Sequence, residues 1–144
     1  MLDNGSTPTG PQSRIPLSDA GGLTQFGAWI VGLPSGSRTS IPHWHTSEDE
    51  LIHVLEGAPT LVEGSAEYEL GPGDVCAYPA GSALPHSIEK RSASDVRLLV
   101  VGTRSGKDVV HYPGAGLTLT IDAEAKLNEF RDEAGKSVSN PYDD

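Results

Sequence analysis

One stretch decides most about this 144-residue chain: His43-Trp-His45-Thr-Ser-Glu-Asp-Glu50-Leu-Ile-His-Val-Leu-Glu-Gly57. Side chains alternate along an extended strand, so His43 and His45 project to the same face. Glu50 comes five positions after His45 and can return across a turn to meet both imidazoles. Imidazole nitrogens together with a carboxylate oxygen suit first-row transition metals. The stretch therefore predicts a site for one divalent metal ion.

A second stretch, Gly73-Asp-Val-Cys-Ala-Tyr-Pro79-Ala-Gly81, is followed by His86, which can close this site as a fourth ligand. Asp49 neighbours Glu50 and faces the other side of the strand. It is therefore the substitute ligand if the strand register differs by one residue. His53 lies three residues after Glu50, also on the other face, which predicts an outward or interface histidine rather than a ligand.

The two stretches resemble the two sequence motifs of the cupin superfamily, and in particular its small single-domain bacterial members. The residues that match at family spacing are His43, His45, Glu50 and Gly57 for the first motif, and Gly73, Pro79 and Gly81 for the second. The resemblance spans roughly residues 23–122. It implies an all-β fold, the double-stranded β-helix or jelly-roll barrel, with the metal near one open end. The implied metal ligands are His43, His45, Glu50 and His86.

Three positions depart from the family pattern. Gly36 stands one residue too far upstream of His43, and Lys90 occupies the position where the family often has Asn. Four residues rather than two separate Gly81 from His86. If His86 is not a ligand, a purely structural protein with an empty site is a further alternative.

Composition predicts a cytoplasmic globular protein of one domain. Cys76 is the single cysteine, so no disulfide within the chain is possible. Neither a secretion signal nor an apolar run of bilayer-spanning length is visible. Ten basic and twenty acidic residues give a formal net charge of −10. Such a chain repels phosphate backbones and anionic lipids, so we expect no direct nucleic-acid or membrane partner.

The order of segments predicts a barrel with an arm before it and an extension after it. Residues 1–22 are rich in Gly, Ser, Thr, Pro and Asp without sustained periodicity, which predicts a flexible arm. Residues 23–122 form the expected barrel, because short apolar runs alternate there with Gly and Pro turns. The expected strands are 23–31, 37–45, 50–55, 60–62, 66–70, 75–78, 84–89, 96–102 and 117–121.

Residues 123–144 are expected to pack on the barrel as a C-terminal extension. We favour irregular and β structure there over a short helix at 123–131, with a hairpin turn at Asp132-Glu-Ala-Gly135. The strands at 50–55 and 98–101 are apolar on both faces, so a second sheet or a second subunit should cover their outer side. Together with the family resemblance, this predicts a homodimer.

Several other residues receive structural interpretations. Trp44 should point away from the metal and make a large apolar contact. His111 is placed in a loop as a structural or surface residue, and Cys76 is expected in the core. Tyr78 is the only nearby acid–base candidate, although its strand face is undetermined.

The predicted function is that of a metal-binding protein that acts on a small molecule. Fe²⁺, Mn²⁺ or Ni²⁺ would keep open coordination positions beside four protein ligands, whereas Zn²⁺ would have a full tetrahedral shell. The first hypothesis is an enzyme on a small polar or chelating metabolite, of the dioxygenase, isomerase or lyase type. The alternative is a non-catalytic module that binds a small ligand, as a sensor does.

Overall fold

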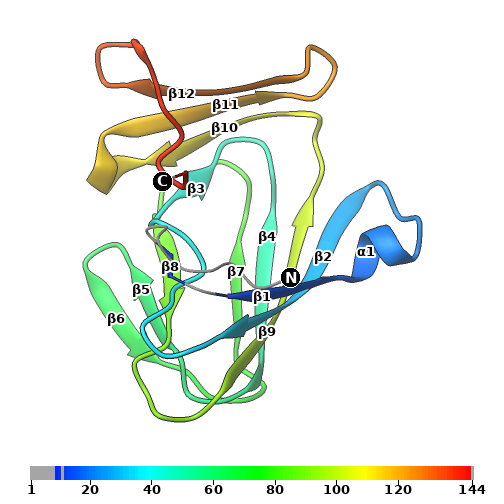
Figure 1. The fold of residues 1–144 in the computed structure, drawn as a ribbon, viewed down its shortest axis with the longest axis vertical. Coiled ribbons are helices and arrows are strands. Elements are labelled where there is room, and N and C mark those ends of the chain that lie inside the picture. The colour runs from blue at the N-terminus through cyan, green and yellow to red at the C-terminus, as the bar shows by residue number, and fades with distance from the viewer. Residues whose placement is uncertain (1–8, 11, 144) are drawn as a thin grey trace.

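The computed structural model describes residues 9, 10 and 12–143 of the chain. Its regular secondary structure consists almost entirely of β-strands, which loops connect (Figure 1). The first sheet has the order β1-β2-β9-β4-β7, the second β13-β12-β11-β10-β3 and the third β6-β5-β8. All strand pairs within them are antiparallel. The all-β class predicted from the sequence is confirmed.

The strands of the first sheet are β1 (Ser13–Pro16), β2 (Phe26–Leu33), β4 (Glu50–Glu56), β7 (Val75–Tyr78) and β9 (Val96–Thr103). Those of the second are β3 (Trp44–His45), β10 (Lys107–Tyr112), β11 (Leu117–Asp122), β12 (Leu127–Asp132) and β13 (Ser137–Val138). Those of the third are β5 (Thr60–Glu63), β6 (Ala66–Glu69) and β8 (His86–Glu89). The helical elements are α1 (Leu17–Ala20) and a 3₁₀ turn (Pro113–Ala115).

The main core lies between the first and third sheets. Along β4, Ile52 and Val54 are buried, whereas Leu51 and Leu55 are exposed on the other side. This alternation places Glu50 on the inner face with Ile52, and His53 on the outer face, as predicted. The core residues contributed by these strands are Val31, Leu33, Ile52, Val54, Leu61, Cys76, Tyr78, Ile88, Val96 and Leu98.

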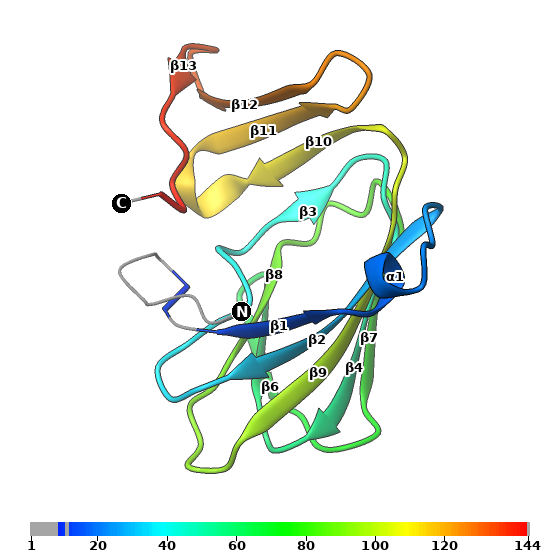
Figure 2. The same ribbon diagram turned by 45° about the vertical axis from the view of Figure 1, so that its right-hand side comes forward.

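The second sheet lies across one end of the other two in both Figure 1 and Figure 2. It has a smaller core of its own, centred on Val110, Tyr112 and Phe130. Phe130 belongs to β12, so the C-terminal segment forms part of a sheet and supplies a buried residue. The preference for β structure over a helix at 123–131 is confirmed, and the Gly135 amide donates to the Asp132 carbonyl in the predicted hairpin turn.

The second half of the predicted flexible arm is structured. β1 pairs with β2 from Ser13–Gly32 to Pro16–Trp29, at the edge of the first sheet (Figure 2). The hydroxyl of Ser18, in α1, is buried and accepts a hydrogen bond of 2.9 Å from the Ala28 amide. Composition alone suggests flexibility here, but these tertiary hydrogen bonds order the segment. Residues 1–8 and 11 of the predicted arm lie outside the described residues.

Two other segments differ from the sequence-based expectation. Only Trp44 and His45 form a strand within the predicted strand 37–45, because the rest of it contacts its neighbours through isolated bridges such as His43 with His86. β10 was not expected, and it places His111 on a strand rather than in a loop. No helix among the described residues is long and apolar enough to cross a membrane.

Candidate metal centre

The structure brings together all four residues predicted as metal ligands, each from a different segment. His45 lies in β3 of the second sheet, Glu50 begins β4 of the first sheet, and His86 begins β8 of the third. His43 precedes β3 and is held against His86 by two backbone hydrogen bonds, of 3.3 and 3.1 Å. The site therefore forms where the three sheets meet, and it depends on the fold rather than on local sequence.

The imidazoles surround the carboxylate of Glu50. The Nε2 atoms of His43 and His45 lie 3.9 and 3.6 Å from its Oε2 atom, and the ligand atoms of these three residues lie within 4.8 Å of one another. Nε2 of His86 lies 2.7 Å from the other carboxylate oxygen, Oε1. His86 thus joins the cluster through Glu50. Three nitrogens and a carboxylate converging in this way match the donor set of a transition-metal site.

Each histidine is oriented by a partner of its other ring nitrogen. Nδ1 of His43 lies 2.9 Å from the Ile41 carbonyl, and Nδ1 of His86 lies 3.1 Å from the Leu84 carbonyl. Both carbonyls are acceptors, so they favour a hydrogen on Nδ1, and the Ser40 hydroxyl also lies 3.0 Å from Nδ1 of His43. Nε2 is then the ring nitrogen that faces Glu50 and that is available to a metal ion.

Asp108 orients His45, and the sequence analysis missed it. Its Oδ2 atom lies 2.6 Å from Nδ1 of His45, and its Oδ1 atom accepts a hydrogen bond of 2.8 Å from the Ser47 amide. The residue is buried. Asp108 alternates with the buried Val110 and Tyr112 along β10, so an acidic residue on an apolar face was the available signal. A carboxylate behind a histidine is a common outer partner of metal ligands.

The charges of the site favour a bound cation. Burial by itself would raise the pKa of Glu50, but hydrogen bonds from His43, His45 and His86 outweigh it and hold that pKa well below the usual range. Burial by itself would lower the pKa of His45, but Glu50 and Asp108 raise it to about 9. Without a metal ion, a proton on His45 therefore balances the buried carboxylates. A divalent cation can take over this balancing role, and so the donor set fits a metal ion.

Tyr78 is not placed to transfer protons. Its ring stacks on the imidazole of His86, with ring centroids 3.5 Å apart and planes inclined by 2°. Its hydroxyl donates a 2.9 Å hydrogen bond to Oε2 of Glu63. Burial, followed by this bond to Glu63, raises the pKa of Tyr78 far above its usual value, so the phenol stays protonated. Tyr78 is a positioning residue for His86.

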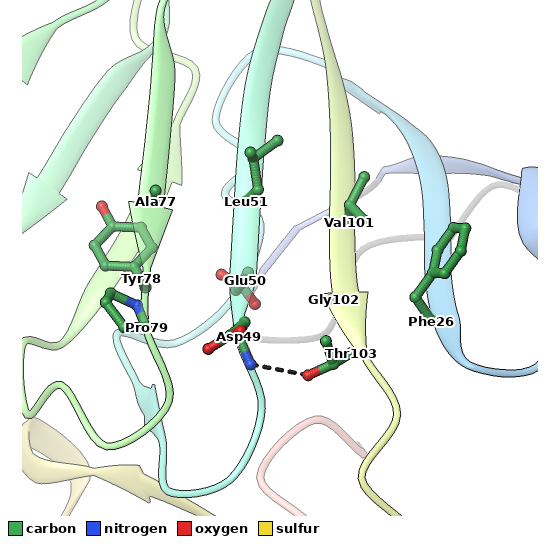
Figure 3. A pocket seen from close by; sticks show the side chains of 10 residues that line it. All are labelled: Phe26, Asp49, Glu50, Leu51, Ala77, Tyr78, Pro79, Val101, Gly102 and Thr103. Atoms are coloured by element: carbon green, nitrogen blue, oxygen red, sulfur yellow. Dashed lines mark hydrogen bonds between the residues drawn. The ribbon is translucent and has the colours of Figure 1, made fainter.

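Asp49 is not among the converging ligands. Its Oδ1 atom accepts a 2.7 Å hydrogen bond from the Ala80 amide. Its own amide donates to the Thr103 hydroxyl, and Figure 3 draws this second bond. The alternative register with Asp49 as the ligand is therefore wrong. Asp49 instead ties the start of β4 to the loop after β7.

The remaining aromatic and thiol predictions concern residues outside the cluster. Trp44 projects to the opposite side of its strand from His45 and stacks on His111, with ring centroids 3.9 Å apart. His111 is therefore a structural partner of Trp44. Cys76 is buried in the main core as predicted, and burial raises the pKa of its thiol.

Two hollows lie on opposite sides of β4. The inner one has a volume of about 190 Å³ and contains His43 and Glu50; the other residues that line it are Arg14, Trp29, Val31, Thr39, Ser40, Ile52 and Val100. The outer one, about 340 Å³, is lined mainly by apolar side chains. In Figure 3, Leu51, Val101 and Phe26 project on the side facing the reader, whereas Glu50 and Tyr78 lie behind the ribbons. Glu50 lines both hollows, whereas His43 lines only the inner one, so the inner hollow presents two of the four candidate metal ligands.

Comparison with known proteins agrees with this architecture. A family model described as a cupin domain matches residues 29–102. No curated protein matched the sequence. Among solved structures, one described as a sugar phosphate isomerase from a cupin superfamily, from Silicibacter pomeroyi, has a TM-score of 0.84 and 34% sequence identity. The match covers 91% of this chain and 82% of that one.

Two further solved structures have folds similar to that of this chain. A putative sugar phosphate isomerase from Acidithiobacillus ferrooxidans has a TM-score of 0.82 and 29% identity, over 90% of this chain and 81% of that one. A predicted oxalate decarboxylase from Thermotoga maritima reaches a TM-score of 0.53 and 25% identity, over 65% of this chain and 78% of its own. The jelly-roll barrel expected from the sequence is confirmed. The family model and the solved structures agree with the observed sheet topology, and so this chain belongs to the cupin family.

Proposed function

We propose that this protein is a metal-dependent isomerase that acts on a small phosphorylated sugar. The observation that carries the proposal is the gathering of three imidazoles around the Glu50 carboxylate, beside a cavity that His43 and Glu50 line. The substrate class is supported by two solved structures that align with at least 90% of this chain, one described as a sugar phosphate isomerase and the other as a putative one.

His43, His45, Glu50 and His86 are the proposed ligands of one divalent transition-metal ion, whose candidates are Fe²⁺, Mn²⁺, Ni²⁺ and Zn²⁺. Three neutral imidazoles and the Glu50 carboxylate leave a 2+ ion and its ligands with one positive charge, which the buried Asp108 carboxylate beside His45 offsets. An open coordination position of the ion can still bind an anionic or chelating molecule. When bound, the ion acts as a Lewis acid that polarises a carbonyl or hydroxyl oxygen.

The cavity walls suit the reaction of a small hydroxylated molecule. Trp29, Ile52 and Val100 contribute apolar surface that excludes water and strengthens electrostatic interactions inside. Thr39 and Ser40 contribute hydroxyl groups, which can hydrogen-bond sugar hydroxyls. An aldose–ketose isomerisation moves hydrogen between neighbouring carbon and oxygen atoms within one molecule. It therefore needs no external oxidant or reductant.

The direct test is to offer the metal-loaded protein a set of pentose and hexose monophosphates and to follow the aldose and ketose forms by NMR. Conversion of at least one ester, lost in His45→Ala, is the expected result. If every ester binds without conversion, the non-catalytic ligand-binding alternative replaces the isomerase. Oxygen uptake or cleavage of a substrate would instead indicate the dioxygenase or lyase types of chemistry.

Asp108→Asn should weaken metal binding without removing a ligand. The amide keeps the shape of the side chain but no longer supplies the negative charge beside Nδ1 of His45. We expect affinity for Mn²⁺ or Zn²⁺ to fall by about 10- to 100-fold. Competition with a fluorescent chelator measures this affinity. The control is Asp122→Asn, because Asp122 is a partly buried acid of β11 that pairs with Lys107. An equal loss of metal affinity in both variants would contradict the assignment of Asp108 as the partner of a metal ligand.

The homodimer expected from the sequence remains a prediction. The outer face of β4 and β7 exposes apolar side chains, among them Leu51, Leu55 and Val75. Exposed apolar patches of this kind often mark contacts between subunits. Sedimentation velocity of the wild-type protein tests the prediction: a dimer is expected, and a monomer at micromolar concentration would contradict it.

A further inference from the structure

Arg14 is a charged residue on the inner side of an edge strand. β1 pairs with β2 so that Arg14 stands opposite Val31. Residues directly opposite in an antiparallel pair share a face, and Val31 is only 3% exposed within the main core. Arg14 therefore lies on the side of β1 that faces Val31, and although the residue is exposed, it lines the same 190 Å³ cavity as His43 and Glu50. Its Nε atom donates a 3.5 Å hydrogen bond to Oε1 of Gln12.

Arg14 and Arg38 both influence the hydroxyl of Tyr142 electrostatically. Burial raises the pKa of this hydroxyl, and hydrogen bonds with Tyr112 and Ile41, followed by the charges of Arg38 and Arg14, oppose this shift. The Tyr142 hydroxyl in turn accepts a 3.2 Å hydrogen bond from the Ile41 amide, and the Ile41 carbonyl orients His43. Arg14 and Arg38 thus lie near the residue that hydrogen-bonds the segment carrying His43, in a chain with a formal net charge of −10.

We propose that Arg14 is the specificity-determining residue that binds the phosphate group of the substrate, while the metal centre holds the hydroxy-carbonyl end. A guanidinium group offers N–H donors in a planar fork, which matches two oxygens of a phosphate. The inference rests on the proposed function, because it assigns the anionic end of the same substrate.

The size of the cavity supports two-ended recognition. A volume of about 190 Å³ lies below the 300–1,000 Å³ usual for drug-sized ligands, so the site accommodates a small metabolite. Arg14, His43 and Glu50 all line this one space. A short sugar phosphate can therefore contact the cation and the guanidinium at once. Holding both ends fixes the orientation of the reacting carbons relative to the metal.

The experiment compares the binding of a pentose phosphate with that of its unphosphorylated parent sugar, using metal-loaded protein and isothermal titration calorimetry. Arg14→Gln should raise the Kd of the phosphate ester by about 10- to 100-fold and leave that of the parent sugar unchanged. The Kd of the phosphate ester for Arg14→Lys should lie between those of the wild type and Arg14→Gln, because lysine keeps the charge but lacks the planar fork of N–H donors. Arg97→Gln, which removes the same charge from an exposed position in β9, should match the wild type.

Equal affinity of the wild type and Arg14→Gln for the ester would overturn the assignment of Arg14, and so would an equal loss in Arg97→Gln. Metal content and turnover, measured on the same samples, separate this failure from that of the proposed function. If the wild type converts the ester and Arg14→Gln binds it unchanged, only the assignment of Arg14 is wrong. If the wild type does not convert the ester but Arg14→Gln binds it more weakly, the isomerase proposal is wrong and Arg14 is still an anion-binding residue.

Discussion

Glu50→Gln is expected to weaken the binding of a divalent metal ion by more than about 100-fold. This loss exceeds the range typical of substitutions in residues that only hydrogen-bond to a metal ligand. Glu50 is the only anionic member of the predicted ligand set, and it contacts all three imidazoles. An amide has the same size but lacks the charge that offsets a 2+ ion. Its oxygen can still accept a hydrogen bond from His86, so the barrel should keep its fold.

The measurement is a metal titration of both proteins against a competing chelator, with thermal unfolding as a check on the fold. Glu56→Gln provides a matched control, since Glu56 is exposed at the other end of the same strand. It should bind metal as the wild type does. Full retention of affinity in Glu50→Gln would show that the carboxylate is not a ligand.

Gly57→Ala should lower the free energy of unfolding by about 3–5 kcal/mol, as the sum of backbone strain and overpacking. Gly57 follows β4 with φ of 91°, in the region that side chains rarely adopt. A Cβ atom there would lie 2.1 Å from the carbonyl oxygen of Asp95 and 3.0 Å from Cγ2 of Val96. Neither the backbone carbonyl nor the buried valine can move away without disturbing β9.

Urea unfolding of the metal-free protein measures this effect, with an unchanged m value as the sign that only stability has changed. The control is Gly71→Ala, because Gly71 lies in a turn with open space around it and without a positive φ. Its stability should stay within about 1 kcal/mol of the wild type, or rise slightly. A Gly57→Ala protein as stable as Gly71→Ala would show that the close approach to Asp95 is not maintained in solution.

The proximity of the three proposed ligands in the first motif was predictable, because their spacing encodes their geometry. His43 and His45 share a face by strand alternation, and Glu50 begins the next long strand at the same end of the barrel. Gly57 was expected from the family motif, and the structure supplies the reason, a close contact with Asp95. His86 was harder to predict from spacing. It reaches the cluster because paired backbone hydrogen bonds hold it beside His43.

The place of Asp108 on an apolar strand face signalled a buried acid. The positions of Asp108 and Arg14 beside the site could not be predicted, because each lies in a segment whose pairing is set by distant residues. Asp108 reaches His45 only once β10 pairs with β3, in the register of Val110 with His45. Arg14 reaches the cavity only once β1 pairs with β2 at the sheet edge. Short strands flanked by glycine and proline carry too little periodicity to fix such a register from sequence.

The same reasoning explains the predicted flexible arm. Residues 13–20 have the composition of a loop, yet Ser13 packs against Gly32, where a Cβ atom would lie 2.4 Å from the Ser13 hydroxyl. The absence of a side chain at Gly32 lets β1 pair closely with β2. Local composition describes the isolated segment, and it contains no information about the partner strand.

Elemental analysis of the protein purified without added metal, carried out in parallel on His45→Ala, tests the metal centre most directly. About one transition-metal ion per chain in the wild type and almost none in His45→Ala is the predicted result. Equal metal content in the two proteins, whether both loaded or both empty, would contradict the assignment of this cluster as a metal centre.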